Sequence, residues 1–353
     1  QRPINSVEES FFSLGGHSLM AVRLFDRIRR RFRADLPIST LFTHPTIRDL
    51  AEIVEETRAQ TRSATDGDGA SDDWDTTTVI HPGPAEGSTP YFIVGGAGGN
   101  VNNLADLGAA LGQHRKVIGI QTRGILGHAP RGTIEEMAAE NIRYIRGHQP
   151  NGPYLLAGHS AGAQTAFEMA RQLVADGEQV AELVLLDTLA PGFVKRAGSA
   201  DPMSAPVQFT PSDRVRHEVG LLADHGLGYF GDRVSANLAD RFLKGAALDL
   251  LAVARPTVAR SRRTKIAWFA AARKYEGGAY DGSVSLIVSK AMGLREERIL
   301  AAYPHLGWDG LIDVAKIARS TVDCSHLAMV RGAQAEALAE LMEARAKGAL
   351  RKA

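Results

Sequence analysis

A serine with a glycine two positions away on each side is the feature of the sequence that most directly suggests chemistry. Gly158, Ser160 and Gly162 form the pattern G-x-S-x-G, where the apolar run at 154–157 meets an apolar pattern of helical period. A sharp turn between a strand and a helix raises the serine hydroxyl clear of the sheet, and the glycines remove side chains that would collide there. The pattern therefore predicts a nucleophile at Ser160. From the motif alone, the alternative is a glycine turn with a capping serine.

A serine that attacks an acyl group needs a base to take its proton, and a carboxylate to hold that base in the right tautomer. In sequences with an elbow of this kind, the three catalytic residues follow one another in the order serine, acid, histidine. His326 comes just after the last strand-like run, whereas His217 and His225 fall inside helical patterns and His305 lies in an earlier loop. The order and the position predict His326 as the base.

The predicted acid is Asp187, which closes the apolar run AELVLLD and should emerge where a buried strand ends. An aspartate that caps the following turn is the alternative. Asp323, three residues before His326, is a competitor for the same role. The other place where such a fold supplies its acid follows the strand ending at Ser289, and the next residues there, Lys-Ala-Met, contain no carboxylate.

Backbone donors for a developing oxyanion are predicted at two loops. The glycine-rich segment at 95–100, GGAGGN, follows a strand-like run and is open enough for N–H groups to approach a substrate. No Lys-Ser/Thr follows it, so a phosphate-binding P-loop is disfavoured. We expect the N–H of Ala97 and the N–H of Ala161, at a helix N-terminus, to form the oxyanion hole.

Alternating strands and helices must position these groups. Strand-like runs lie at 78–81, 91–95, 116–122, 154–157, 182–187 and 283–289, and helical patterns lie at 101–112, 133–148, after Ser160 and at 332–347. This alternation predicts an α/β fold with a mainly parallel sheet covered on both faces. Residues 203–280 interrupt it with helical patterns at 211–227, 235–254 and 256–274, which predict a lid or a packing subdomain.

The N-terminal part has a different organisation. Residues 1–58 read as a small helical unit in which Leu19, Val22 and Phe25 have helical spacing and Ser18 stands where the helix begins. On residue type alone, Ser18 would be a helix N-cap. Residues 59–76 are rich in Asp, Gly, Ser and Thr, which predicts a flexible linker with a span of roughly 20–25 Å.

The N-terminal motifs FFSLGGHSLMAVRL and LFTHPTIRDLAEIVE resemble the peptidyl carrier domain of nonribosomal peptide synthetases. The resemblance implies that Ser18 carries a 4′-phosphopantetheine arm, attached by a phosphopantetheinyl transferase, with a peptide bound to the arm as a thioester. It also implies upstream condensation and adenylation domains in the same polypeptide. Such carriers have a further helix before this segment, which the sequence does not contain. The basic run at 259–265 is predicted as a solvated helix face, with carrier docking as the alternative.

Residues 77–353 resemble the terminal thioesterase domain of the same synthetases, through QTRGILG, TIEEMAAENIRYIRGHQPNGPYLLAGHSAG, LVLLD and DCSHLAMV. The resemblance implies an α/β-hydrolase fold with a helical lid. It also implies that a peptidyl chain passes from the arm on Ser18 to Ser160, and leaves by macrocyclisation, cyclo-oligomerisation or hydrolysis. Gly95 and Gly96 stand where many relatives have a proline-bearing turn. A proofreading (type II) thioesterase, an esterase or lipase, and a non-catalytic docking module are the alternatives.

Composition narrows the partners further. A formal net charge of +1 gives no reason to expect nucleic acid or an anionic membrane as a partner. The sequence has no apolar run long enough to cross a bilayer and no apolar signal segment, so we expect a cytoplasmic piece of a longer polypeptide. The single cysteine, Cys324, excludes an internal disulfide and a thiolate zinc cluster, and no metal site is predicted.

Overall fold

The computed structural model of the chain describes residues 6–14, 18–32, 34, 36, 40–63, 75–84, 88–193, 256–290 and 300–353. The lid patterns predicted at 211–227 and 235–254 lie outside these residues, as do His217 and His225. What the structure describes of the predicted lid is its last helix, α10 (Pro256–Ala272).

Seven strands form one sheet in the order β1-β3-β2-β4-β5-β6-β7. The strands are β1 (Thr77–His81), β2 (Tyr91–Val94), β3 (Val117–Ile120), β4 (Tyr154–His159), β5 (Val180–Leu186), β6 (Val284–Ser289) and β7 (Ile317–Val322). All neighbouring pairs are parallel except β1 with β3. The predicted mainly parallel sheet is confirmed, and its one antiparallel strand lies at the edge.

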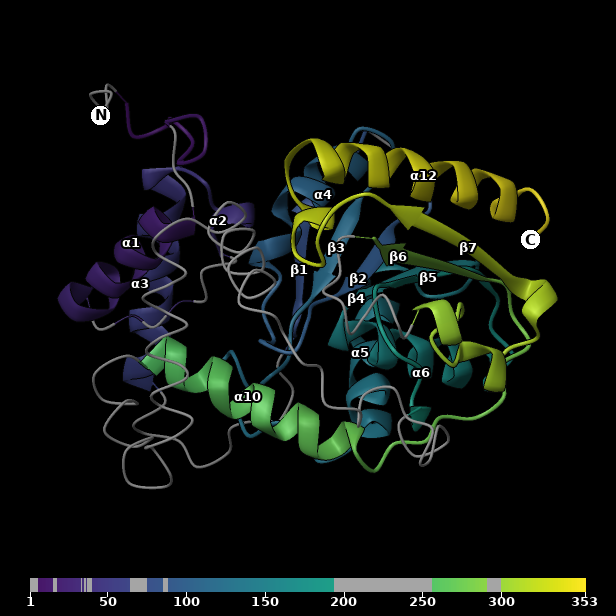
Figure 1. The fold of residues 1–353 in the computed structure, drawn as a ribbon. Helices are drawn as coiled ribbons and strands as arrows, with labels where there is room; N and C mark the ends of the chain where they lie inside the picture. Colours follow the sequence, from purple (N-terminus) through teal and green to yellow (C-terminus); the bar gives the residue numbers. More distant parts are fainter. Residues whose placement is uncertain are drawn as a thin grey trace, which may run out of the picture.

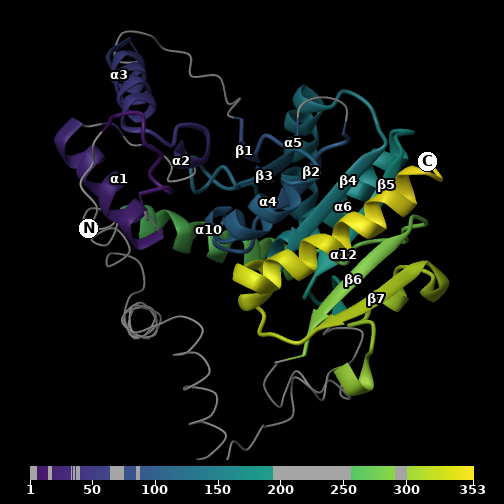
Figure 2. The ribbon, with the colours of Figure 1, turned by 90° about the horizontal axis from the view of Figure 1, so that it is seen from above.

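Helices cover both faces of the sheet (Figures 1 and 2). Helices α5 (Ile134–His148), α6 (Ala161–Ala175) and α10 contribute side chains to the core on one face, while α4 (Ala105–Leu111) and α12 (Gly332–Leu350) contribute to the core on the other. Every residue of β2, β3, β4 and β6 is buried, as expected for parallel strands with both faces covered. In the part of the chain that the structure describes, no helix combines the length and the apolar character needed to cross a lipid bilayer.

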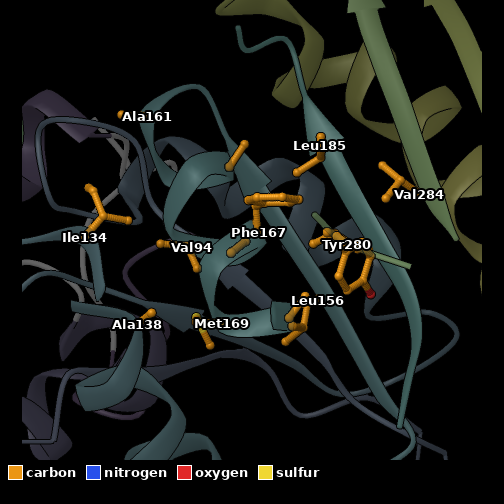
Figure 3. Close-up of a cluster of buried hydrophobic side chains, with 14 of the residues drawn as sticks. Val94, Ile134, Ala138, Leu156, Ala161, Phe167, Met169, Leu185, Tyr280 and Val284 are labelled. Atoms are coloured by element: carbon orange, nitrogen blue, oxygen red, sulfur yellow. The ribbon is translucent and has the colours of Figure 1, made fainter. Parts of the chain in front are cut away.

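Phe167 illustrates how the first of these cores holds the site in place. It projects from α6 into a cluster that includes Val94, Leu185 and Tyr280 (Figure 3). Its ring makes edge contacts with Tyr280 and Trp308, at centroid distances of 5.8 and 4.9 Å. The helix that begins next to Ser160 is thus anchored by fully buried aromatic packing, which keeps its N-terminus in one position relative to the sheet.

Among its described residues, the N-terminal unit has three helices: α1 (Ser18–Phe32), α2 (Thr40–Thr43) and α3 (Ile47–Ser63). Their small core contains the buried side chains of Ala21, Phe25, Ile28, Ala34, Leu41, Leu50 and Val54. Helix α2 lies against β1 (Figure 1). Helix α3 continues five residues into the segment predicted as linker, because the residues up to Ser63 are mostly adequate helix formers and the Asp- and Gly-rich composition begins only after it.

Four short 3₁₀ helices occur at the described connections: η1 (Asn102–Leu104), η3 (Trp308–Gly310), η4 (Val314–Lys316) and η5 (Ala328–Val330). The last strand-like run of the sequence, which begins at Val314 and precedes His326, starts in the structure as η4, where the Asp313 carboxylate accepts a hydrogen bond from Ala315 N. The strand proper begins at Ile317. This local cap competes with strand pairing, and apolar patterning alone does not reveal it.

Candidate active site

Ser160 occupies a strained turn between β4 and α6, with φ 57° and ψ −124°. A Cβ on Gly158 would lie 2.4 Å from Ala163 Cα, and one on Gly162 would lie 2.4 Å from the carbonyl oxygens of Val94 and Gly95. Both positions therefore require glycine. A positive φ is rare for serine and costs on the order of 1–3 kcal/mol, which the surrounding packing sustains. The local structure is the elbow that the sequence predicted.

Asp187 and His326 meet at the carboxyl edge of the sheet. Asp187 follows directly after β5, and His326 lies in the loop between β7 and η5. Its Nδ1 is 2.7 Å from Asp187 Oδ2. The carboxylate side chain is fully buried, and the imidazole is 39% exposed, which leaves it accessible to a ligand in the pocket. The competitor Asp323 is exposed, and the carboxylate that binds the ring is that of Asp187.

Ser289, the last residue of β6, holds the same carboxylate and was missed as a site residue. Its hydroxyl donates to Asp187 Oδ2 at 2.6 Å, and its backbone N–H donates to Oδ1 at 3.1 Å. Burial by itself would raise the pKa of Asp187, but the hydrogen bonds from His326 and Ser289 outweigh it, so the pKa lies below its ordinary value. The signal that could have revealed Ser289 is a small polar residue closing a buried strand that neighbours β5.

His159, the residue before the elbow serine, is a second residue whose place in the site was missed. It is only 1% exposed, and its ring stacks on that of His326 with centroids 4.8 Å apart and an interplanar angle of 27°. Its Nε2 lies 3.0 Å from the backbone oxygen of His326, and its Nδ1 lies 3.4 Å from Asn103 Nδ2. Burial, followed by the proximity of His326, lowers the pKa of His159 to about 4. The ring is therefore neutral at ordinary pH.

The glycine-rich loop after β2 approaches the elbow closely. Gly95 N donates to Ile120 O at 3.0 Å, and Gly99 N donates to Gly96 O at 2.9 Å, which closes a tight turn around Ala97. A Cβ on Gly96 would lie 3.6 Å from His159 O and 3.9 Å from the Ser160 Cβ. Within the described ranges, the N–H groups of Ala97 and Ala161 have no hydrogen-bond acceptor, so both remain available to a ligand.

Helix α10 packs on the outer side of this loop. Ser261 Oγ donates to Gly98 O at 3.0 Å, and a Cβ on Gly99 would lie 2.7 Å from Thr264 Cγ2. Thr264 is buried, whereas Arg263 and Lys265 are exposed. The basic run at 259–265 is thus solvated along one side of the helix, and its other side supports the loop.

An open pocket of about 770 Å³ brings these groups together. Its walls include Ser160, His326, His159 and Ala97, and Phe12 from the N-terminal unit also lines it. The described remainder of the wall comprises Gly96, Gly98, Asn100, Asn102, Asn103, Ala105, Asp106, Leu327 and Arg331. The predicted nucleophile, base and one predicted oxyanion donor therefore open into one space.

Ser18 is the first residue of the 15-residue helix α1. A phosphodiester suits this place, because the first N–H groups of a helix are unpaired and the helix dipole favours negative charge there. The residue present, a serine, supplies the hydroxyl that such a linkage needs. His305, the remaining histidine weighed from the sequence, lies in the loop before η3, where its backbone oxygen accepts a hydrogen bond from Trp308 N.

A seven-stranded sheet with helices on both faces and an elbow serine at its carboxyl edge defines an α/β-hydrolase fold. Family comparison agrees. Residues 89–346 match the thioesterase domain family, and residues 1–54 match the phosphopantetheine attachment site family. The chain belongs to the thioesterase domain family, and its N-terminal part is a carrier for covalently attached 4′-phosphopantetheine.

Relatives place this pair of domains among peptide synthetases. The chain is 39% identical over 191 residues to an indigoidine synthase of Dickeya dadantii (strain 3937), and 38% identical over 195 residues to a dimodular nonribosomal peptide synthase of Bacillus subtilis (strain 168). Each alignment covers 54% of this chain, but only 12% and 8% of those two proteins. The chain is thus a carrier–thioesterase didomain of nonribosomal peptide synthetase type, corresponding to a small part of its relatives.

Solved structures share the fold. A holo four-domain nonribosomal peptide synthetase, AB3403, bound to AMP and glycine, matches with a TM-score of 0.57 at 23% identity, covering 96% of this chain and 24% of that one. The NocB thioesterase domain from the nocardicin cluster matches with a TM-score of 0.51 at 21% identity, covering 75% and 96%. At these identities the likeness establishes the fold alone.

Proposed function

We propose that this thioesterase releases a finished peptide from its own carrier through an ester on Ser160. The observation that carries the proposal is the 2.7 Å contact of His326 Nδ1 with the buried Asp187 carboxylate, in a pocket shared with the strained Ser160. The domain limits of 1–58, 59–76 and 77–353 belong to the same proposal. Because Phe12 lines the active-site pocket, a carrier placed in this way has a short path for delivery.

Ser18 is the proposed attachment point of the 4′-phosphopantetheine. When bound, the group supplies a terminal thiol that holds the peptide as a thioester. The chain's own contribution at this end is the N-terminus of α1, whose unpaired N–H groups stabilise a phosphodiester. A phosphopantetheinyl transferase would install the arm, and upstream synthetase domains in the same polypeptide would supply the peptide.

The residues of the pocket perform the transfer. Ser160 Oγ attacks the thioester carbonyl carbon as its proton passes to His326 Nε2, the ring nitrogen left after Nδ1 binds Asp187. The carbonyl π electrons move to oxygen, and the N–H groups of Ala97 and Ala161 stabilise that oxyanion. The intermediate collapses, the carbon–sulfur bond breaks, and the imidazolium returns its proton to the sulfur. Asp187 stays ionised throughout and stabilises the imidazolium.

A second nucleophile then completes release by the same path in reverse. His326 Nε2 takes its proton as it adds to the acyl carbon, and Ser160 Oγ leaves with that proton when the ester breaks. Water gives a linear acid, an amine or hydroxyl of the peptide gives a ring, and attack by a further peptide unit before closure gives an oligomeric ring. The release mode depends on which of these the pocket admits.

Replacing the nucleophile tests the function directly. In the full chain loaded with a peptidyl thioester, Ser160→Ala should lower the rate of release by on the order of a thousandfold or more, because no ester can form. Ser320→Ala, in the edge strand β7 of the same sheet, serves as a matched control and should release at the normal rate. Product is quantified by mass spectrometry, and the same chains are treated with a fluorophosphonate probe.

The proposal fails if the Ser160→Ala chain releases product at the wild-type rate. Failure of the wild-type chain to be labelled at Ser160 would instead support a non-catalytic docking module. Release of unrelated free esters at rates above those of tethered thioesters would favour an esterase.

A further inference from the structure

His159 has no part in the proton transfers above, yet its ring stacks on that of the proposed base. It is almost completely buried, at 1% exposure, while the neighbouring His326 side chain is 39% exposed. Burying a polar ring is costly unless both nitrogens are paired. In His159 both nitrogens have partners, so the ring is held in one tautomeric form.

The partners define that form. The His326 carbonyl oxygen can only accept, so His159 Nε2 carries the proton and donates across 3.0 Å. Asn103 Nδ2 can only donate, so the unprotonated Nδ1 of His159 accepts from it. At 3.4 Å this second contact is the longer and weaker of the two. A second proton on the ring would point an N–H at another N–H and place a charge in a buried site beside His326 and Arg331. The hydrogen bond to the His326 carbonyl and the Asp187 carboxylate favour the charged ring, but burial and the neighbouring positive groups outweigh them.

His326 is held at both its side chain and its backbone. Its side chain is bound by Asp187 at Nδ1, and its backbone oxygen is bound by His159 Nε2. These two contacts lie on either side of the Cα–Cβ bond. Together with the stacking of the two rings, they restrict the rotation and the translation of the imidazole.

The backbone of His159 belongs to the strand that leads into the nucleophile. It is the last residue of β4, where it is in register with Leu186 of β5, and its backbone carbonyl faces Gly96 of the oxyanion loop. The next residue is Ser160. One residue therefore joins the strand that bears the nucleophile to the loop that bears the base.

We propose that neutral His159, supported by Asn103, is a positioning residue that sets the distance between Ser160 and His326 by donating Nε2–H to the His326 carbonyl. It acts through His326 and does not exchange protons with the substrate. The proposal rests on the proposed function of Ser160 and His326. An error of about 1 Å in such a distance costs on the order of a hundredfold in rate.

Two substitutions separate the hydrogen bond from the packing. His159→Phe keeps an aromatic ring to stack on His326 and removes the donor. His159→Gln places an amide N–H near the position of Nε2 and gives up the ring. We expect His159→Phe to lower kcat by roughly 10- to 100-fold with little change in KM, and His159→Gln to recover most of that loss.

Two further readouts report on geometry rather than on stability. The rate of labelling of Ser160 by a fluorophosphonate should fall in His159→Phe by about the same factor as kcat, because that reaction uses the same nucleophile and base. In proton NMR, the low-field resonance of the proton between His326 Nδ1 and Asp187 should broaden or disappear in His159→Phe and persist in His159→Gln. Thermal unfolding verifies that each chain is folded.

Should His159→Phe fail to fold, Asn103→Ala takes its place, since Asn103 is half-buried and its loss leaves the core intact. Asn103→Ala should also lower kcat, by a smaller factor than the one expected for His159→Phe. The inference is wrong if folded His159→Phe labels and turns over at the wild-type rate, or if His159→Gln is as impaired as His159→Phe. Such a result with Ser160→Ala still inactive overturns the role of His159 alone, whereas an active Ser160→Ala overturns the proposed function.

Discussion

At Asp187, burial and hydrogen bonding act on one carboxylate in opposite directions. Burial favours the neutral acid, while His326 Nδ1 and two donors from Ser289 favour the anion, and the hydrogen bonds prevail. A carboxylate that stays charged can stabilise an imidazolium beside it without taking its proton. The end of β6, where the chain has no acid of its own, thus contributes Ser289 as a support for the acid on β5.

His159 gives a prediction about stability and pH. Its pKa is about 4 in the folded chain and about 6.5 when exposed, so between these values the unfolded chain binds a proton that the folded chain does not. The free energy of unfolding should therefore fall as pH drops from about 6.5 to about 4, by about 3 kcal/mol in full. Above that pH range, the titration of His159 no longer changes the free energy of unfolding.

Urea unfolding of wild type and His159→Gln at a series of pH values measures how His159 changes the free energy of unfolding with pH. Other groups also titrate, among them Asp187, whose lowered pKa adds stability that is lost at still lower pH. The difference between the two chains isolates His159: the wild type should lose more stability than the variant below pH 6.5. Parallel curves through that window would contradict the prediction.

At the scale of elements, the elbow depends on how closely α6 can approach β2. Gly162 lies in the first turn of α6, and a Cβ there would meet two backbone oxygens at 2.4 Å, which no rotamer change can relieve. Helix α6 would have to move outward and take the Ala161 N–H and the strained Ser160 with it. A small change in volume at this position is therefore a change in the geometry of the site.

Gly162→Ala should destabilise the chain by roughly 1–3 kcal/mol or more through overpacking and abolish most labelling of Ser160 by a fluorophosphonate. Gly147→Ala is the matched control, since it is also a helical glycine but a Cβ there has no neighbour within 4 Å. It should leave labelling unchanged and raise stability by roughly 0.5–1 kcal/mol. Chemical unfolding and labelling rates measure both, and equal behaviour of the two variants would show that close packing at Gly162 is unimportant.

The sequence predicted the elements that carry strong periodicity and the residues that stand at their ends. Ser160 and Asp187 follow buried strands, and the elbow motif together with the order serine, acid, histidine led to their prediction. Ser289 and His159 were not predicted. The bond from Ser289 to Asp187 depends on the order of the strands, and the contacts of His159 with Asn103 and the His326 loop depend on tertiary packing. The same holds for the antiparallel pairing of β1, since a run of apolar residues carries no direction.

At the scale of the whole molecule, the two domains are stabilised by hydrophobic cores of different size. The sheet is covered on both faces by large cores, whereas the three helices of the carrier share a small set of buried side chains. The N-terminal unit nevertheless borders the candidate active site, because Phe12 from the segment before α1 lines the same pocket as Ser160 and His326. Because the two domains belong to one polypeptide, they stay close to each other even without a strong contact between them.

Mixing two inactive chains tests that proximity. A Ser160→Ala chain that carries the loaded arm and a Ser18→Ala chain that has an intact active site together possess every part, but only between molecules. The tether predicted at 59–76 from its composition would supply an effective concentration in the millimolar range. At about 10 µM of each chain, the mixture should therefore release product roughly a hundredfold more slowly than the wild type.

The rate in the mixture should also rise in proportion to the concentration of the Ser18→Ala chain, while the wild-type rate per molecule stays constant on dilution. Product is counted by mass spectrometry after loading with the same peptidyl thioester, and unloaded Ser18→Ala chain confirms that no arm is attached there. A mixture that matches the wild type at this concentration would mean that delivery is intermolecular, and the carrier would then serve neighbouring chains as readily as its own.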